Sequence, residues 1–212
     1  MKLVLNGHDE RYVVEQGMLN LFPGERPVYE PIGPGDDSWA VVTLREDDRC
    51  HVTVELCFRG KSLPYSLDVP LVGDEFQREG IRRRAIGKCF FLAARALTGH
   101  TPPWGMLTGV RPVKLPTRAL LSGATPLQAK QELREEYYVS PDRAALAVDC
   151  AQASLNAQRT LKEDEVSLYV GIPFCPTRCA YCSFVSQSVE RTLGLVEPYL
   201  EVLHREITDA AR

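Results

Sequence analysis

The sequence has no excess of either charge, no long apolar run and only four histidines. Its 28 acidic and 25 basic side chains give a formal net charge of −3, which argues against a dedicated nucleic-acid-binding protein. The most apolar helical stretch, CFFLAARAL, is short and contains Arg95, and the apolar stretch at the N-terminus is too short for a signal peptide. We therefore expect a cytoplasmic protein that does not bind nucleic acid and does not span a membrane.

The seven cysteines are unevenly distributed. Three of them, Cys175, Cys179 and Cys182, fall within the stretch CPTRCAYC. Cytoplasmic cysteines seldom form structural disulfides, so such a cluster indicates metal binding or catalysis. The other four are expected to be small core or surface residues: Cys50, Cys57, Cys89 and Cys150.

Residues 1–160 show the pattern of an α+β domain. Residues 38–70 alternate between apolar and polar side chains, which predicts an antiparallel meander of strands. Helical spacing of apolar residues follows over 75–97, and Gly99 is placed to end that helix. Thr125 and Ser140 each precede a proline and predict the starts of two further helices. The charged stretch LKEDE then predicts a domain boundary at 161.

Residues 161–212 have the pattern of a strand, a loop and a helix. VSLYV at 166–170 alternates like a half-buried strand, and Gly171 and Pro173 then open a loop that contains the three cysteines. Apolar residues at helical spacing mark one face of a helix over 195–212. This order is the first βα unit of a parallel α/β structure, in which active sites lie in loops after the strands.

Three close thiolates fit two kinds of metal site. An iron–sulphur cluster held by three cysteines leaves one iron open to a small molecule. A structural zinc site needs a fourth ligand, and the nearest candidate is His204 on the following helix. The single cluster of cysteines favours iron–sulphur, with structural zinc and unliganded reactive thiols as the alternatives.

These residues resemble a known family. CPTRCAYC has the Cys-x3-Cys-x2-Cys spacing of the radical S-adenosylmethionine (SAM) enzymes. YVGIPFCPTRCAYCSF is similar to the oxygen-independent coproporphyrinogen III dehydrogenase group, most closely to its HemZ-like branch. WGMLTGVRPVKLPTR, at 104–118, resembles that branch alone. The resemblance implies that residues 161–212 begin a radical SAM partial (β/α) barrel.

The resemblance also implies cofactors and site residues. Cys175, Cys179 and Cys182 would hold a [4Fe-4S] cluster whose fourth iron binds S-adenosyl-L-methionine. Tyr169 and Tyr181 would contact SAM, although a strand tyrosine and a loop aromatic in the core are the plainer interpretations. An electron from a donor such as flavodoxin or ferredoxin would release a 5′-deoxyadenosyl radical.

The implied reaction is the oxidative decarboxylation of coproporphyrinogen III to protoporphyrinogen IX, in haem biosynthesis. Two positions depart from the family pattern: Gly171 replaces a frequent histidine, and Phe184 replaces a further cysteine. The second departure resembles the haem-chaperone branch, so a haem-binding chaperone is the alternative function. A zinc-stabilised interaction module is a remoter one.

A partial barrel needs about six strand–helix units, of which this chain supplies one. The chain is therefore expected to be an N-terminal fragment that is inactive by itself. The arginine run 82–84 has two interpretations: a solvated helix face, or cations that face the propionates of a tetrapyrrole.

Overall fold

The computed structural model describes residues 1–109, 111–162, 164–177, 179, 182, 184 and 186–211. It divides into two compact units, Met1–Thr160 and Leu161–Arg212. The first unit contains both hydrophobic cores of buried residues, and the second contains the cysteine loop.

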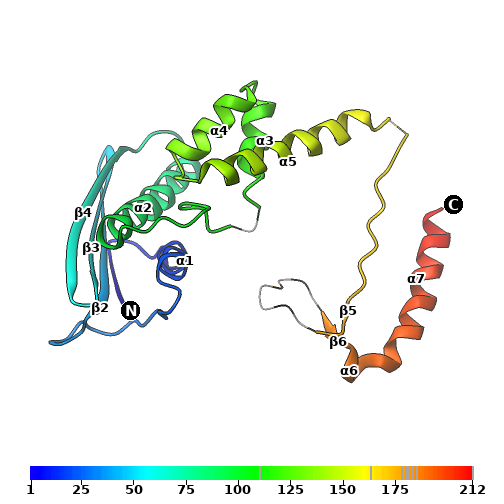
Figure 1. Ribbon diagram of the computed structural model, residues 1–212, viewed down its shortest axis with the longest axis horizontal. Coiled ribbons are helices and arrows are strands. Elements are labelled where there is room, and N and C mark those ends of the chain that lie inside the picture. The colour runs from blue at the N-terminus through cyan, green and yellow to red at the C-terminus, as the bar shows by residue number, and fades with distance from the viewer. Residues whose placement is uncertain are drawn as a thin grey trace. The chain divides into compact units, whose positions relative to one another are not determined.

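The first unit is built on a four-stranded mixed sheet in the order β1-β2-β3-β4 (Figure 1). Strands β2 (Ser38–Glu46), β3 (Arg49–Phe58) and β4 (Lys61–Pro70) form the predicted antiparallel meander. Strand β1 (Lys2–Asn6) pairs in parallel with β2. The sequence did not predict β1, because its apolar run is too short to show an alternating pattern.

Local turn chemistry sets the register of the meander. Arg59 and Gly60 both have positive φ, 53° and 74°, as a two-residue hairpin turn between twisted strands requires. Between β2 and β3, the Asp47 carboxylate accepts a hydrogen bond from the Arg49 N–H at 2.7 Å. Two tight turns thus connect the three strands of the predicted meander.

Both edges of the sheet are interrupted. On the β4 edge, Pro64 and Pro70 have no backbone N–H to donate to a further strand. On the β1 edge, the Leu3 N–H donates to the Val28 carbonyl at 2.8 Å, and the Val28 N–H donates to the Met1 carbonyl at 3.1 Å. Val28 therefore pairs with β1 and covers part of this edge.

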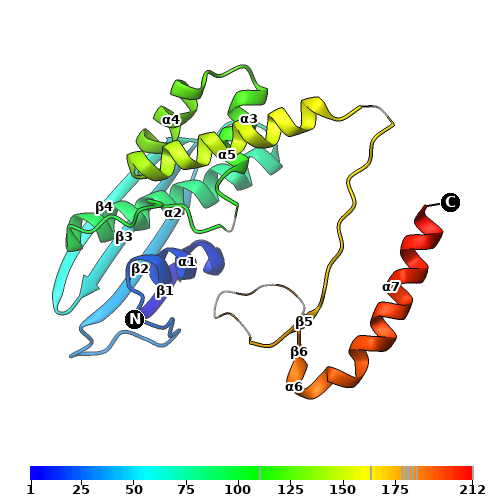
Figure 2. The same ribbon diagram turned by 45° about the vertical axis from the view of Figure 1, so that its right-hand side comes forward.

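Helices α1 (Arg11–Leu21) and α2 (Glu75–Thr98) cover one face of the sheet (Figures 1 and 2). Helix α2 begins at a capping box in which Asp74 and Gln77 exchange hydrogen bonds of 2.8 and 2.9 Å. It ends at Gly99 with φ 69°, as predicted. Helix α1 was not predicted. The core between helices and sheet includes the fully buried Val14, Met18, Val42, Val52, Val54, Leu56, Ile86 and Phe90.

Three helices form a second core: α3 (Lys114–Leu121), α4 (Pro126–Glu135) and α5 (Pro141–Thr160). The predicted caps are confirmed, since Thr125 forms a capping box with Gln128 and the Ser140 hydroxyl accepts from the Arg143 N–H at 3.4 Å. This core contains the buried side chains of Ala129, Leu133, Val139, Ala144, Ala147 and Val148.

The second unit contains two short strands, β5 (Phe174–Cys175) and β6 (Gln187–Ser188), then α6 (Val189–Thr192), the 3-10 turn η1 (Leu193–Leu195) and α7 (Val196–Ala210). The helix predicted from residue 195 is confirmed.

The strand predicted over 166–170 is wrong for this structure: these residues are irregular, and Val166 and Leu168 are 90% and 74% exposed. A strand needs a neighbour to pair with its backbone, and none of the described residues pairs with this segment. The barrel unit therefore stays a prediction.

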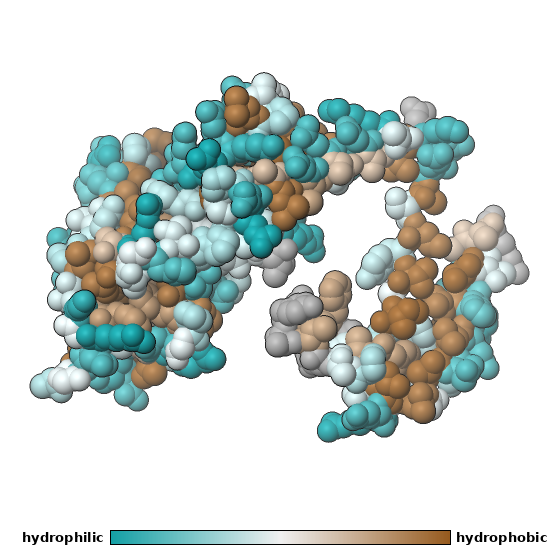
Figure 3. Space-filling view, in the orientation of Figure 1, coloured by the Kyte–Doolittle hydropathy of each residue, from teal (hydrophilic) through white to brown (hydrophobic). Residues whose placement is uncertain are grey.

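Apolar side chains gather along the irregular segment and on α7 (Figure 3). Those that remain exposed in the second unit include Val166, Leu168, Ile172, Leu193, Leu195 and Ile207. No helix among the described residues has the length and apolar character needed to cross a bilayer.

Candidate functional site

The cysteine loop is closed at its base by a short parallel pairing. Cys175 lies in β5 opposite Ser188 in β6, and Phe174 lies opposite Gln187. The Gln187 N–H also donates to the Pro173 carbonyl at 2.7 Å. The chain just before and just after the stretch with the other two cysteines is therefore held together, with Cys175 and Ser188 opposite each other.

The three motif cysteines are free thiols. Cys175 and Cys182 are half-buried and Cys179 is exposed. A backbone hydrogen bond links the last two, because the Cys182 N–H donates to the Cys179 carbonyl at 3.0 Å. Within the described part of the chain, no three histidine, cysteine or acidic side chains are gathered closely enough to hold a metal ion.

The donor set itself fits an iron–sulphur cluster. All three thiols are unpaired by disulfides, the loop is closed at its base, and Cys179 is open to solvent. Thiolate sulphur is the protein ligand of such clusters, and three thiolates leave one iron of a four-iron cluster for another molecule. A tetrahedral zinc site would need a fourth ligand, and His204, the other candidate, lies exposed on α7.

Of the two tyrosines expected to contact a cofactor, the structure describes Tyr169 but not Tyr181. Tyr169 is 82% exposed, so it faces outward as in the plainer interpretation, but it lies in an irregular segment and not on a strand. Its ring lies beside Gly171: a Cβ built on Gly171 would be 3.3 Å from the Tyr169 Cε1 atom. Tyr181 lies outside the described residues. Phe184, which stands where the family pattern has a further cysteine, is 71% exposed.

Tyr199 is a site residue that sequence reasoning missed. The apolar pattern over 195–212 indicates no more than a helix face for this residue, but its hydroxyl donates a hydrogen bond to the Gly171 carbonyl at 2.5 Å. Its ring also meets the Phe174 ring edge-on, with centroids 5.4 Å apart at 78°. The sequence does contain one indication of this role: a tyrosine on an apolar helix face carries a hydroxyl that needs a hydrogen-bond partner.

The arginine run of α2 is divided by its contacts. Arg82 pairs with Glu46 at 2.9 Å and with Glu75 at 2.6 Å, and Arg83 pairs with Glu10 at 3.1 Å. Hydrogen bonds to the Glu75 and Glu46 carboxylates raise the pKa of Arg82. Two of the three arginines are therefore committed to ion pairs within the fold, as expected of a solvated helix face.

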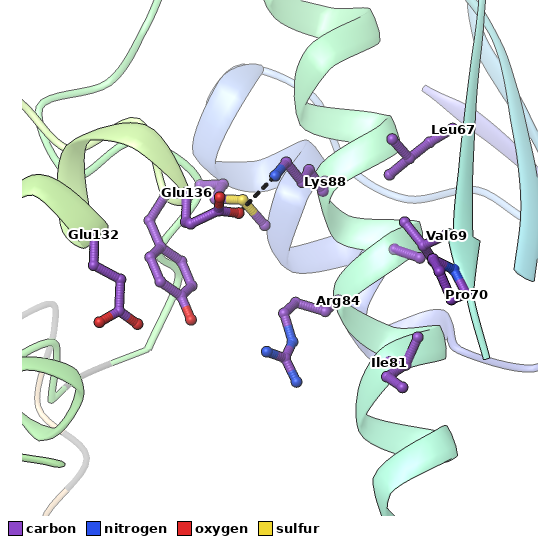
Figure 4. Close-up of a pocket in the computed structure, with 11 residues that line it drawn as sticks. Leu67, Val69, Pro70, Ile81, Arg84, Lys88, Glu132 and Glu136 are labelled. Atoms are coloured by element: carbon purple, nitrogen blue, oxygen red, sulfur yellow. Dashed lines mark hydrogen bonds and ion pairs between the residues drawn. The ribbon is translucent and has the colours of Figure 1, made fainter. Parts of the chain in front are cut away.

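Arg84 has no ion-pair partner among the described residues and lines a cavity of about 390 Å³ beside β4, α2 and α4 (Figure 4). Apolar side chains such as Ile81 and Val69 form one wall. Lys88 pairs with Glu136 across the cavity at 2.9 Å, and the Glu132 carboxylate also lies there (Figure 4). Cations and carboxylates thus balance, so the cavity is not specific for anions.

No protein-family model matches the chain. Among curated proteins, it is 33% identical to the oxygen-independent coproporphyrinogen-III oxidase-like protein HemZ of Bacillus subtilis (strain 168), in an alignment of 214 residues. The alignment covers 98% of this chain and 42% of that protein. The chain therefore spans about two fifths of the length of its relative, and the similarity includes both units.

Proposed function

We propose, on the premise that this chain is HemZ-like over 98% of its residues, that it is part of a radical SAM enzyme acting on a tetrapyrrole. The observation that carries the proposal is the closed loop with three free thiols, Cys175, Cys179 and Cys182. These thiolates would bind a [4Fe-4S] cluster, and S-adenosyl-L-methionine would occupy the iron that has no protein ligand.

The chain's own residues would bind and position this pair of cofactors. Cys175, held in β5, fixes one ligand, while Cys179 and Cys182 follow on the loop. Tyr169 offers an exposed aromatic face beside Gly171, and Tyr181 directly precedes the third thiol in sequence. When bound, the cofactors supply one electron and a 5′-deoxyadenosyl radical, and the protein supplies orientation and shielding.

The relative's name, coproporphyrinogen-III oxidase-like, supports a porphyrin substrate. We infer that the reaction is the oxidative decarboxylation of coproporphyrinogen III propionates to the vinyl groups of protoporphyrinogen IX. Each conversion removes a hydrogen atom, carbon dioxide and one electron from a propionate. An external acceptor must take that electron, and a donor such as flavodoxin or ferredoxin must reduce the cluster. We propose that this reaction takes place in the cytoplasm.

The second candidate function is a haem-binding chaperone of the same superfamily. It is favoured by one position, because Phe184 stands where the decarboxylase pattern has a further cysteine. Such a protein would keep the cluster and SAM but transfer haem to an acceptor.

The metal content tests the proposed site. The complete protein, reconstituted anaerobically with iron and sulphide, should contain about four irons and show a broad thiolate-to-iron absorption. Cys179→Ala should lose both signals. Cys150→Ala is the matched control, since Cys150 is also exposed but lies in α5 of the first unit, and it should keep both. Stoichiometric zinc without iron uptake would instead support a zinc-stabilised interaction module and refute the proposal.

The product separates the two haem-related functions. Anaerobic incubation of the complete protein with coproporphyrinogen III, SAM and a reductant should yield products lighter by one carbon dioxide and two hydrogens for each converted propionate. Haem bound and transferred, with no change in porphyrin mass, would establish the chaperone instead.

A further inference from the structure

Tyr199 contacts the chain at two points just before it enters the cysteine loop. Its hydroxyl donates to the carbonyl of Gly171, four residues before Cys175, at 2.5 Å. Its ring meets the edge of Phe174, the residue next to Cys175, at a centroid distance of 5.4 Å. One half-buried side chain of α7 therefore fixes both the backbone and the side chain that lead to the first thiol.

Gly171 is the residue at which two tyrosines meet. Its carbonyl accepts the Tyr199 hydrogen bond, and its missing side chain makes room for the Tyr169 ring, which would crowd a Cβ at 3.3 Å. The Tyr169 ring thus lies against the same residue whose carbonyl Tyr199 holds. Because segment 166–172 is irregular, no strand ladder holds it, and the Tyr199 hydrogen bond is its fixed point on α7.

We propose that Tyr199 is a positioning residue: it holds residues 171–174 so that the Cys175 thiol and the Tyr169 ring are presented together to the cofactors. This inference rests on the proposed function, since it takes Cys175 as a cluster ligand and Tyr169 as a SAM contact. Tyr199 itself touches neither cofactor. Its hydroxyl acts through Gly171 and its ring acts through Phe174.

Tyr199→Phe removes the hydrogen bond but retains the ring contact with Phe174. In the reconstituted protein, we expect unchanged iron content and melting temperature, but SAM affinity about three- to tenfold weaker, as loss of one positioning hydrogen bond predicts. Equilibrium dialysis with labelled SAM measures the affinity. Addition of SAM should also shift the electron paramagnetic resonance spectrum of the reduced cluster less than in the unmodified protein.

A second measurement needs no cofactor. In the iron-free protein, Tyr199→Phe should raise the alkylation rate of the half-buried Cys175 about twofold or more, while the rate of the exposed Cys150 stays constant. Tyr12→Phe is the matched control: Tyr12 is a 70% exposed tyrosine on α1, and its replacement should change neither measurement.

These measurements test the proposed function and the positioning role of Tyr199 separately. If the unmodified protein takes up no iron, the proposed function fails, and the alkylation rate of Cys175 still tests whether Tyr199 holds the loop entry. If iron binds but SAM affinity, spectrum and Cys175 reactivity are all the same in Tyr199→Phe, the positioning role is refuted and the cluster proposal stands.

Discussion

The side-chain amide of Asn20 donates a hydrogen bond to the carbonyl of Gly105, at 3.1 Å. On the same segment, the Met106 N–H donates to the Tyr137 carbonyl at 3.0 Å. Both contacts are made by segment 104–118, which includes Gly105. It is therefore attached to α1 at one point and to the end of α4 at another, and it joins the two cores of the first unit.

Gly105→Ala should destabilise the first unit more than an ordinary glycine substitution. Gly105 has φ 58°, and an added Cβ would clash with backbone atoms of Tyr137 and Tyr138. The left-handed conformation alone costs alanine about 1 kcal/mol, and the clash should bring the loss of unfolding free energy to roughly 2 kcal/mol or more. Urea unfolding followed by circular dichroism measures the difference.

Gly99→Ala is the control for this prediction. Gly99 has a similar φ of 69°, but nothing lies within 4 Å of its added Cβ. It should therefore show only the conformational cost. Equal losses in the two variants would mean that the loop relaxes around the new methyl group.

His8 should make the stability of the first unit depend on pH. Its Nδ1 atom accepts from the Glu10 N–H at 3.2 Å and its Nε2 atom lies 3.3 Å from the Val42 carbonyl, an arrangement that suits the neutral ring. Burial lowers the pKa of His8 below its ordinary value of 6.5, although the Val42 carbonyl and the carboxylates of Glu10 and Asp9 oppose that shift.

The direction of the pH effect follows from this lowered pKa. Between the two pKa values the unfolded chain binds a proton that the folded chain does not, so the His8 contribution is complete above about pH 6.5 and is lost as the pH falls. Unfolding free energies at pH 7.5 and 5.5 should therefore differ more in the unmodified protein than in His8→Gln. The same pH dependence in both would show that other groups cause it.

The buried and the exposed cysteines should differ sharply in reactivity. Burial raises the pKa of the Cys89 thiol to about 12, and burial also raises that of Cys50, so neither forms a thiolate near neutral pH. Cys150 and Cys179 are exposed. Iodoacetamide at pH 8 should modify Cys150 and Cys179 in the native protein, and Cys50 and Cys89 only after denaturation. Peptide mass spectrometry identifies the sites, and rapid labelling of Cys89 would contradict its placement in the core.

If the two tyrosines contact SAM as proposed, Tyr169→Ala and Tyr181→Ala should weaken SAM binding without removing iron, because the proposed cluster ligands are the three cysteines. A loss of about tenfold in affinity would match one aromatic contact with the adenosyl group. Tyr12→Ala serves as the control for general effects of removing an exposed tyrosine. If reductive cleavage of SAM proceeds at the same rate in both site variants, the two tyrosines have structural roles only.

Patterns that are local in sequence predicted the fold of the first unit well. The alternation through Val52 and Val54, the caps at Thr125 and Ser140, and Gly99 at the end of α2 depend on neighbouring residues alone. β1 was missed because its partner is distant in sequence: parallel pairing with β2 places Lys2 opposite Trp39. The five residues of β1 themselves are too few to show a strand pattern.

The second unit shows where such patterns stop being sufficient. Alternation over 166–170 indicates two different faces, but it does not supply a neighbouring strand, and the segment is irregular. Cysteine spacing identified the candidate ligands, since metal donors are recognisable by type. Tyr199 was missed because its partner, Gly171, lies 28 positions away and contributes only a backbone carbonyl.

The interrupted edges of the sheet limit the association of one folded molecule with another through strand pairing. A free edge strand offers a row of unpaired donors and acceptors to any extended chain nearby, which is the usual beginning of amyloid growth. Here Pro64 breaks that row on β4, and Val28 already occupies it on β1. A concentrated solution of the folded protein should therefore resist seeding through this sheet, and Pro64→Thr should shorten the lag before thioflavin-positive fibrils form.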